Sequence, residues 1–356
     1  MKIVRKILDL SFQLIEKNKI LAKFKPVLHA ADGFFFGVDK LNIVPHITDY
    51  IDLKRYMSFV IIGLLPSVLA SIYFWGWRVI LVILTSYIFG GMIEVAFAVV
   101  RKKEIHEGFL VTGMIFPLIL PPSVPLWAVA LGVMFGVFFG KEVFGGTGKN
   151  VFNPAIVGRI FLTICFPQIM TTTWPKPYIG GLGGFMRLSV DSVTSATPLV
   201  AFKGDHALLP WNELLFGYGG GCIGEVFRLG IILGGIFLII CRVSNWRLPF
   251  SYLFTVALFS FLGNKFAPAK FAPVYFQLLT GGLLFGALFM ITDPVTCPFT
   301  KAGKWIGGII LGLLTVLIRA ISGYVEGVMF SILMFNALTP LIDHIVLSIK
   351  YNRPKI

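Results

Sequence analysis

One long apolar stretch places a strong limit on what this chain can fold into. Residues Val79–Val100 hold a single charged side chain, Glu94, among 22 positions. A helix of that length rises about 33 Å, enough to cross the ~30 Å hydrocarbon core of a bilayer. Charged residues make up only 13% of the 356 residues, whereas soluble domains carry about 25%. The sequence therefore excludes a soluble enzyme, a disordered chain and a disulfide-stapled secreted module, and it predicts an all-α integral membrane protein.

Similar apolar runs predict ten membrane segments, five on each side of a polar segment at residues 171–225. The predicted segments are Tyr56–Trp75, Val79–Val100, Gly108–Leu120, Leu126–Gly140, Ala155–Met170, Val226–Cys241, Pro249–Gly263, Val274–Ile291, Trp305–Ile321 and Gly327–Leu347. The third is short for a full crossing, so short or broken helices are expected. Because each half has an odd number of segments, the halves are expected to be inverted five-helix repeats.

A short internal echo supports the inverted repeat. Phe144-Gly145 precedes Asn153-Pro154 in the first half, and Phe285-Gly286 precedes Asp293-Pro294 in the second. Each pair follows an apolar segment. Asn153-Pro154 comes before the fifth predicted segment, and Asp293-Pro294 comes before the ninth. We therefore expect Asn153 and Asp293 to be counterparts in the two halves.

Basic residues are distributed unevenly between the connecting segments. With both termini in the cytoplasm, the cytoplasmic segments hold 22 Lys and Arg and the outside segments hold 6. This positive-inside asymmetry accounts for the net charge of +14 without a nucleic-acid partner. The predicted division is a cytoplasmic amphipathic leader at 1–55, a first repeat at 56–170, an outside loop at 171–225, a second repeat at 226–347 and a cytoplasmic tail at 348–356.

An acidic side chain inside the second predicted segment is a strong functional candidate. Glu94 follows Gly90 and Gly91, whose missing side chains are expected to leave space for a ligand or a neighbouring backbone. An ionisable group at that depth is costly, so Glu94 should pair, bind a cation or stay protonated. The alternative is a paired acid that only anchors the helix.

Four more charged residues lie within predicted segments or at their ends. Arg159, Arg228 and Arg319 are candidates by the same argument, and a structural ion pair or interfacial anchor is the alternative for Arg159 and Arg319. Asp343, which precedes His344 near the predicted cytoplasmic end, is expected to be a solvated anchor rather than an ion ligand.

A glycine-rich run at residues 140–150 leads into Asn153-Pro154. It resembles a phosphate-binding loop only superficially, because Asn150 stands where that motif has Ser or Thr. We interpret the run as irregular backbone that lines a site, where Asn150 and Asn153 offer amides to the edge of a heterocycle. Asp293, between Thr292 and Pro294, should cap or break a helix, orient a cofactor or attract a cation.

The outside loop contains a Ser- and Thr-rich stretch, Asp191–Leu199. An ordinary turn explains most such stretches, but a Thr hydroxyl beside a small Ala can carry a covalent adduct. The four cysteines lie far apart and form no CxxC pair. We therefore expect no metal or iron–sulfur site built by this chain alone.

Several stretches together resemble a known family over nearly the whole chain. They are Leu53–Met57, Gly140–Arg159, Asp191–Leu199, Ile223–Glu225, Phe285–Pro294 and Pro340–His344. They look like the B-type subunits of the Na⁺-translocating NADH:quinone oxidoreductases, and many are shared with the related D-type subunits of Rnf ferredoxin:NAD oxidoreductases. Ser195 departs from the family pattern, which usually has Gly there.

The resemblance implies two flavins. Thr197 would carry FMN through a phosphoester bond, with Thr194 and Thr172 as fallback positions. A non-covalent riboflavin would lie near Asn150 and Asn153, with Asp293 beside the cofactor.

The resemblance also implies quinone and ion sites. Gly90, Gly91 and Glu94 match positions associated with the quinone pocket and with sodium uptake, and Glu94 would be the residue that couples the two. The acids at Asp293 and Asp343 match positions linked to sodium handling.

The implied protein is a flavin-bearing component of a sodium-pumping complex in the bacterial inner membrane. It would relay electrons from FMN through riboflavin to quinone. Partner subunits with flavin and iron–sulfur centres would oxidise NADH, because this chain has no dinucleotide fingerprint. The alternatives are a D-type component of an Rnf complex and a stand-alone urea- or ammonium-type channel, which would have no use for a flavin on Thr197.

Overall fold

A computed structural model of the chain describes residues 5, 8–13, 28, 32, 53–102, 108–171, 174–180, 184–185, 196–324 and 326–351. Most of the predicted leader and tail lie outside these residues, as do Asp191–Ser195 of the outer motif. The helices of the first half are α3 (Leu53–Trp75), α4 (Arg78–Arg101), α5 (Gly108–Leu118), α6 (Leu126–Val137), α7 (Pro154–Cys165) and α8 (Pro167–Thr171). The π-helix η2 (Phe138–Glu142) continues α6.

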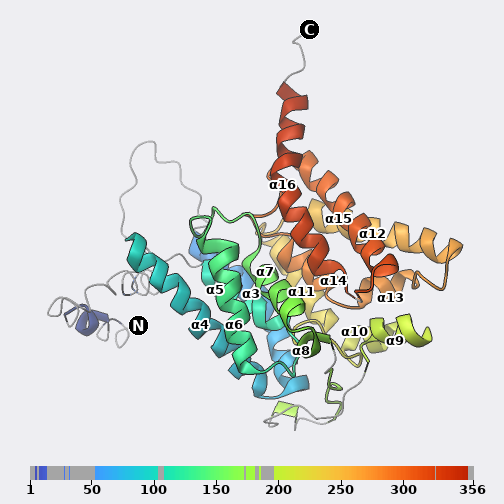
Figure 1. Cartoon of the computed structure of the whole chain (residues 1–356), viewed down its shortest axis with the longest axis horizontal. Coiled ribbons are helices and arrows are strands. Elements are labelled where there is room, and N and C mark those ends of the chain that lie inside the picture. The colour runs from blue at the N-terminus through green and yellow to red at the C-terminus, as the bar shows by residue number, and fades with distance from the viewer. Residues whose placement is uncertain are drawn as a thin grey trace.

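Two short helices, α9 (Pro198–Asp205) and α10 (Trp211–Phe216), occupy the middle of the chain. The second half contains α11 (Arg228–Ile240), α12 (Arg247–Phe266), α13 (Val274–Leu279), α14 (Leu283–Phe285), the π-helix η4 (Gly286–Met290), α15 (Lys301–Ile321) and α16 (Val328–Tyr351). Figure 1 shows α4, α5 and α6 grouped on one side of the molecule and α12, α15 and α16 on the other.

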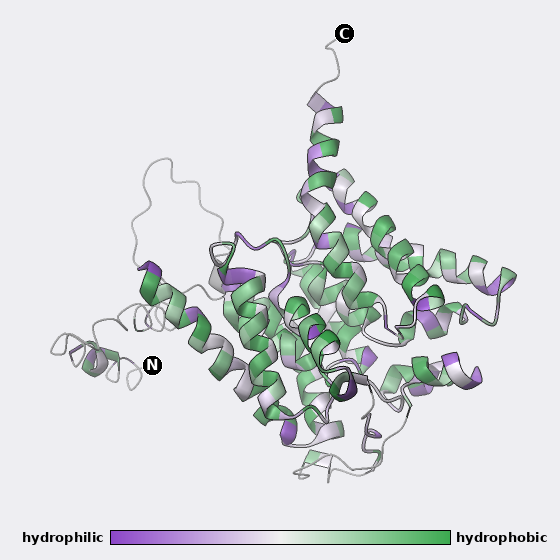
Figure 2. Cartoon of the chain, in the orientation of Figure 1, coloured by the Kyte–Doolittle hydropathy of each residue, from purple (hydrophilic) through white to green (hydrophobic). Residues whose placement is uncertain are grey.

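Four helices in the described part of the chain are long and apolar enough to cross a membrane. They are Arg55–Trp75, Arg78–Arg101, Lys301–Ile321 and Val328–Tyr351, and they match the first, second, ninth and tenth predicted segments. Apolar residues run along the helices, while hydrophilic residues gather towards helix ends and connecting segments (Figure 2). The regular structure of the described residues is therefore helical, as expected of a membrane protein.

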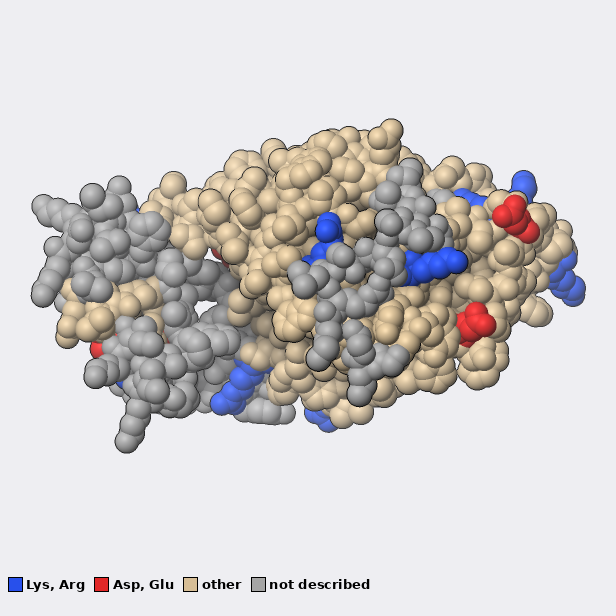
Figure 3. All heavy atoms as spheres, turned by 90° about the horizontal axis from the view of Figure 1, so that it is seen from below, with Lys and Arg blue, Asp and Glu red and all other residues tan. Residues whose placement is uncertain are grey.

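The outward face of α4 is apolar, as expected of a surface that contacts lipid. Leu81, Leu84, Ile88 and Met92 recur at helical spacing and are each about half exposed, while Val82, Ser86 and Glu94 face the interior. Exposed leucine, isoleucine and methionine on one stripe suit a hydrocarbon solvent. Seen from below, the described surface is mostly uncharged, with separate basic and acidic side chains scattered over it (Figure 3).

The two halves meet along close helix contacts. Helix α3 packs on α11, and α7 packs on α16. At the α3–α11 crossing, any side chain on Gly234 would overlap the backbone carbonyl of Gly63. Glycine thus lets the two backbones approach, as is common between membrane helices.

Two predicted segments are interrupted in the structure. Val274–Ile291 is not one span: it consists of α13, α14 and η4, because Thr280 is extended and Gly281 takes a positive φ of 64°. Ala155–Met170 breaks at Phe166, which leaves helical geometry before Pro167. Proline disfavours helical backbone in the residue before it, so this break has a local cause.

Candidate functional site

Glu94 forms a buried ion pair in the first half. Its Oε1 lies 2.5 Å from Nζ of Lys141, and the two side chains are 6% and 3% exposed. Its Oε2 has no hydrogen-bond partner among the described residues. Of the three expected states for Glu94, the structure shows pairing.

Lys141 lies in the π-helix η2 and contacts α4 from there. Lys141 and the adjacent Glu142 both contact α4, since Glu142 pairs with Arg101 at 3.0 Å. The Arg101 side chain is 28% exposed, so this second pair is closer to solvent. Single π-turns of this kind are frequent at functional sites. Sequence reasoning did not identify Lys141 as a site residue. Its position directly after the apolar segment Leu126–Gly140 is the sequence feature that could have indicated it.

The expected space beside Gly90 and Gly91 is filled. A Cβ on Gly90 would lie 2.7 Å from Cε2 of Phe109, and one on Gly91 would lie 3.4 Å from the same ring. Phe109 on α5 also packs edge-on against Tyr87 of α4. The two glycines therefore accommodate an aromatic side chain rather than a neighbouring backbone, and a ligand at Gly90 would have to displace Phe109.

A cavity of about 60 Å³ with both apolar and polar lining residues lies between the two halves, and we call it the Asn cavity. Its lining includes Asn150, Asn153, Asp293 and Lys141, together with Tyr56 of α3. The structure thus brings together the three residues expected beside riboflavin, which the sequence placed in separate halves. Lys141 lines this cavity while it holds Glu94, so one side chain connects the two candidate sites.

The same residues shape the local backbone. Asn153 caps α7 by accepting a hydrogen bond from the Ala155 N–H at 3.1 Å, and Pro154 takes the first helical position. Asp293 accepts from the Val295 N–H at 3.4 Å and from the Thr296 hydroxyl at 3.0 Å. Asp293 therefore caps the turn that follows η4 and not a helix, which next begins at Lys301.

Thr197 lies at the N-terminus of α9, on the rim of a second cavity that we call the Thr197 cavity. Its hydroxyl oxygen accepts a hydrogen bond from the Val200 N–H at 3.4 Å. The cavity has a volume of about 400 Å³, and Arg159, Glu225 and Glu326 also line it. The sequence identified Thr197 but assigned no role to the two glutamates. The fallback positions Thr194 and Thr172 lie outside the described residues.

A lysine ties α9 to the opposite rim of this cavity. Lys203 donates to the carbonyl oxygens of Ser322 and Tyr324 at 3.0 and 2.8 Å. Partial burial, with repulsion from Arg319, lowers the pKa of the Lys203 ammonium from its usual value. The helix that carries Thr197 is thereby attached to the segment that leads to Glu326.

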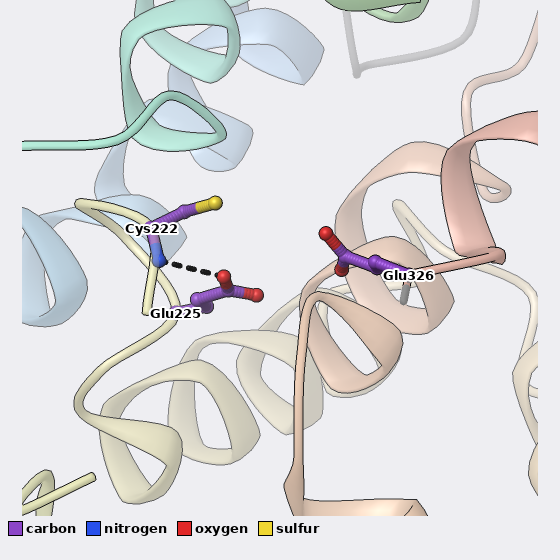
Figure 4. Close-up of side chains that lie close together, drawn as sticks. All are labelled: Cys222, Glu225 and Glu326. Carbon is purple, nitrogen blue, oxygen red and sulfur yellow. Dashed lines mark hydrogen bonds between the residues drawn. The ribbon is translucent and has the colours of Figure 1, made fainter. Parts of the chain in front are cut away.

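A buried charged cluster lines the Thr197 cavity. Arg159 Nη2 lies 2.6 Å from Glu326 Oε2, and the Cys222 N–H donates to Glu225 Oε1 at 2.6 Å. In Figure 4, Cys222 and Glu225 share one loop and face Glu326 on another segment. Glu225 Oε2 and Arg159 Nη1 have no hydrogen-bond partner within the described part of the chain. The sulfur and carboxylate oxygens lie within 4.8 Å of one another, but Arg159 already neutralises Glu326.

The other two buried arginines hold backbone carbonyls. Arg319 donates to the carbonyls of Gln277 and Thr280 at 2.8 and 2.9 Å. Arg228 donates to the carbonyls of Leu214 and Val226 at 2.7 and 3.2 Å. Both therefore stabilise chain segments where helices end or break, and Arg159 is the one that forms an ion pair.

The expectation that Asp343 is solvated is wrong. Its side chain is 4% exposed and accepts hydrogen bonds from the Phe299 N–H, the Thr300 N–H and the Thr300 hydroxyl. Because α16 packs against the start of α15, the carboxylate faces free N–H groups there instead of water. Asp343 thus holds the entry of α15 in place.

Comparison with known proteins places the chain among relatives of similar length. The profile of the NQR2, RnfD, RnfE family matches residues 40–352. The chain is 35% identical to the B-type subunit of the Na(+)-translocating NADH-quinone reductase of Pseudomonas paraeruginosa, over 98% of both chains. It is 34% identical to the subunits of the same name from Azotobacter vinelandii, over 99% of this chain and 98% of that one, and from Yersinia pestis, over 94% of both. The chain therefore belongs to the NQR2, RnfD, RnfE family.

Proposed function

We propose that the chain is the membrane flavoprotein subunit of a sodium-translocating NADH:quinone reductase. It would pass electrons from FMN on Thr197, through riboflavin at Asn150 and Asn153, to quinone, and couple their passage to sodium movement. Full-length similarity to relatives named for that activity supports the assignment to the complex. The observation that carries the flavin part is the position of Thr197 at a helix N-terminus beside a large cavity.

The surroundings of Thr197 fit a phosphoester-linked flavin. A phosphate on its hydroxyl would meet the Leu199 and Val200 N–H groups and the positive end of the α9 dipole, which favour anions. The cavity volume of about 400 Å³ falls within the ~300–1,000 Å³ of small-molecule sites. When bound, the isoalloxazine supplies the redox chemistry. The protein would supply position, shielding from water and the charges of Arg159, Glu225 and Glu326.

In-gel fluorescence tests this proposal directly. The complex is purified, separated by denaturing electrophoresis and viewed under ultraviolet light. A fluorescent band is expected at the 39.4 kDa mass of the chain, because a phosphoester survives denaturation. A dark band at that mass contradicts the covalent flavin and favours a channel without a cofactor.

Riboflavin at the Asn cavity is a separate part of the proposal. The cavity, about 60 Å³, is smaller than a typical ligand site, so a flavin ring requires the two halves to part along this seam. Two buried amides that converge on one cavity support a heterocycle site there. The chain's own contribution would be hydrogen bonds from Asn150 and Asn153 to the ring edge.

Substitution of these amides should lower the content of non-covalent flavin. Asn150→Leu or Asn153→Leu leaves polar edges of the flavin unpaired, at about 1–3 kcal/mol each. That corresponds to roughly a 5- to 150-fold loss of affinity. Flavin released by acid from the purified variants measures it. Wild-type content in both variants would contradict the site, and Asn245→Leu, on an exposed turn, serves as a control.

Glu94 is proposed to couple quinone reduction to the ion step. Quinone would enter at Gly90 and Gly91 after displacement of Phe109, which the lipid-facing side of α4 allows. Asp293 and Asp343 are the further proposed ion residues. Both already accept protein hydrogen bonds, so a cation at either one would share its carboxylate with those donors.

Glu94→Ala should raise the sodium concentration required for half-maximal quinone reduction, because it removes the charge and both ligand oxygens. Reduction of the upstream flavins by NADH should stay nearly intact, and Glu94→Asp should fall between. Steady-state rates over a sodium titration measure the effect. If Glu94→Ala assembles normally and its sodium dependence is unaltered, Glu94 has no coupling role.

The proposed setting is a bacterial inner membrane with both termini in the cytoplasm and Thr197 outside. Ten membrane segments in two inverted repeats are part of this proposal. The pairing of α3 with α11 and of α7 with α16, which are the first and last segments of the two halves, supports the repeat. Partner subunits with flavin and iron–sulfur centres would deliver electrons from NADH.

A further inference from the structure

Lys141 belongs to two sites at once. Its ammonium holds Glu94 at 2.5 Å, and its side chain also lines the Asn cavity with Asn150, Asn153 and Asp293. A lysine has a flexible four-carbon stem, so its charge can move several ångströms without any backbone change. The cavity therefore offers this ammonium a second place next to polar groups.

The Glu94 carboxylate is only half satisfied in this structure. Oε1 is bound by Lys141, while Oε2 is buried without a partner in the described part of the chain. A buried carboxylate without a counter-ion is strongly unfavourable. If the ammonium leaves, Glu94 must recruit another cation or a proton.

The other charged residues near Glu94 do not replace Lys141 as its partner. Glu142 is occupied by Arg101, which binds both its carboxylate and its backbone carbonyl. Asp293 faces the cavity from the second half, and Lys141 acts on it electrostatically. Lys141 and Asp293 thus line the same cavity, while Glu94 holds the ammonium.

We propose that Lys141 is an internal cation that competes with sodium for Glu94. With the ammonium on Glu94, sodium is excluded. With the ammonium drawn into the Asn cavity, the carboxylate is free to bind sodium. This inference rests on the proposed ion role of Glu94 and adds the residue that controls access to it. Negative charge arriving in the cavity would favour the second arrangement, which would link the electron relay to the ion step.

Removal of the competitor should strengthen sodium binding. If the ammonium occupies Glu94 about nine-tenths of the time, it weakens apparent sodium affinity about tenfold. Lys141→Gln should therefore lower the half-saturating sodium concentration about tenfold, the opposite of the Glu94→Ala effect. Lys141→Arg should raise it, because a guanidinium can hold the carboxylate through two parallel hydrogen bonds.

Two readouts test this on the purified complex. One is quinone reduction titrated with sodium chloride, with potassium chloride keeping ionic strength constant. The other is thermal stabilisation by sodium without NADH or quinone, which reports binding alone. Lys265→Gln is the control, because it removes the same charge from an exposed position at the end of α12 that does not line the Asn cavity, and it should leave the sodium response unchanged.

The two variants keep the inference falsifiable. If Lys141→Gln fails to assemble, Lys141→Arg still has to raise the half-saturating concentration. An unchanged or raised value in an assembled Lys141→Gln complex, or an unchanged value in Lys141→Arg, overturns the inference. If the wild-type rate itself does not respond to sodium, the proposed function fails. A wild-type response with no shift in the variants refutes only the role of Lys141.

Discussion

Replacement of Thr197 with alanine is expected to abolish the covalent flavin of this chain while leaving the protein in the membrane. The hydroxyl is the only part of Thr197 that can form a phosphoester, so the loss should be complete. Loss of the helix cap at α9 adds about 1 kcal/mol of local destabilisation, too little to unfold a membrane protein. In-gel fluorescence at equal protein loading measures the result.

Two control variants separate attachment from helix capping. Thr197→Asn keeps a good N-cap residue but lacks a hydroxyl, so it should also be dark. Thr171→Ala removes a hydroxyl from the same cavity and should keep full fluorescence, because Thr171 bonds within its own helix to Pro167. Full fluorescence in Thr197→Ala would contradict the assignment and direct attention to Thr194 and Thr172.

Arg159→Met is expected to destabilise the folded chain strongly. The Arg159 side chain is 8% exposed and pairs with Glu326 at 2.6 Å, which connects α7 to the segment before α16. Removal of one partner from a buried pair leaves the other charge uncompensated, at a cost of about 3–5 kcal/mol. The Glu225 carboxylate lines the same cavity, and it would repel the unpaired carboxylate of Glu326.

Thermal unfolding of the complex in detergent measures this effect through the midpoint temperature. The double variant Arg159→Met/Glu326→Gln should recover much of the stability, because no unpaired charge then remains from the pair. A midpoint for Arg159→Met equal to that of the wild type would show that the pair does not hold the halves together.

The sequence determined the membrane class and the long spans. Hydropathy is a local property that adds up over about 20 residues, so α4 and α15 could be located without any knowledge of their neighbours. Thr197, Asn150 and Asn153 were proposed as site residues from short contiguous patterns. The caps formed by Asn153 and Asp293 were likewise predictable, since their hydrogen bonds reach only two or three residues ahead.

Only the tertiary structure decided which residues meet. Lys141 is 47 residues from Glu94, and Glu326 is 167 residues from Arg159. Phe109 fills the space of Gly90, and Asp343 is buried, because of how neighbouring helices are rotated and packed. Rotation of one helix about its axis changes every cross-helix contact but not the helix's own hydropathy. A single sequence therefore reveals the spans, whereas the pairing of charges between them depends on the packed fold.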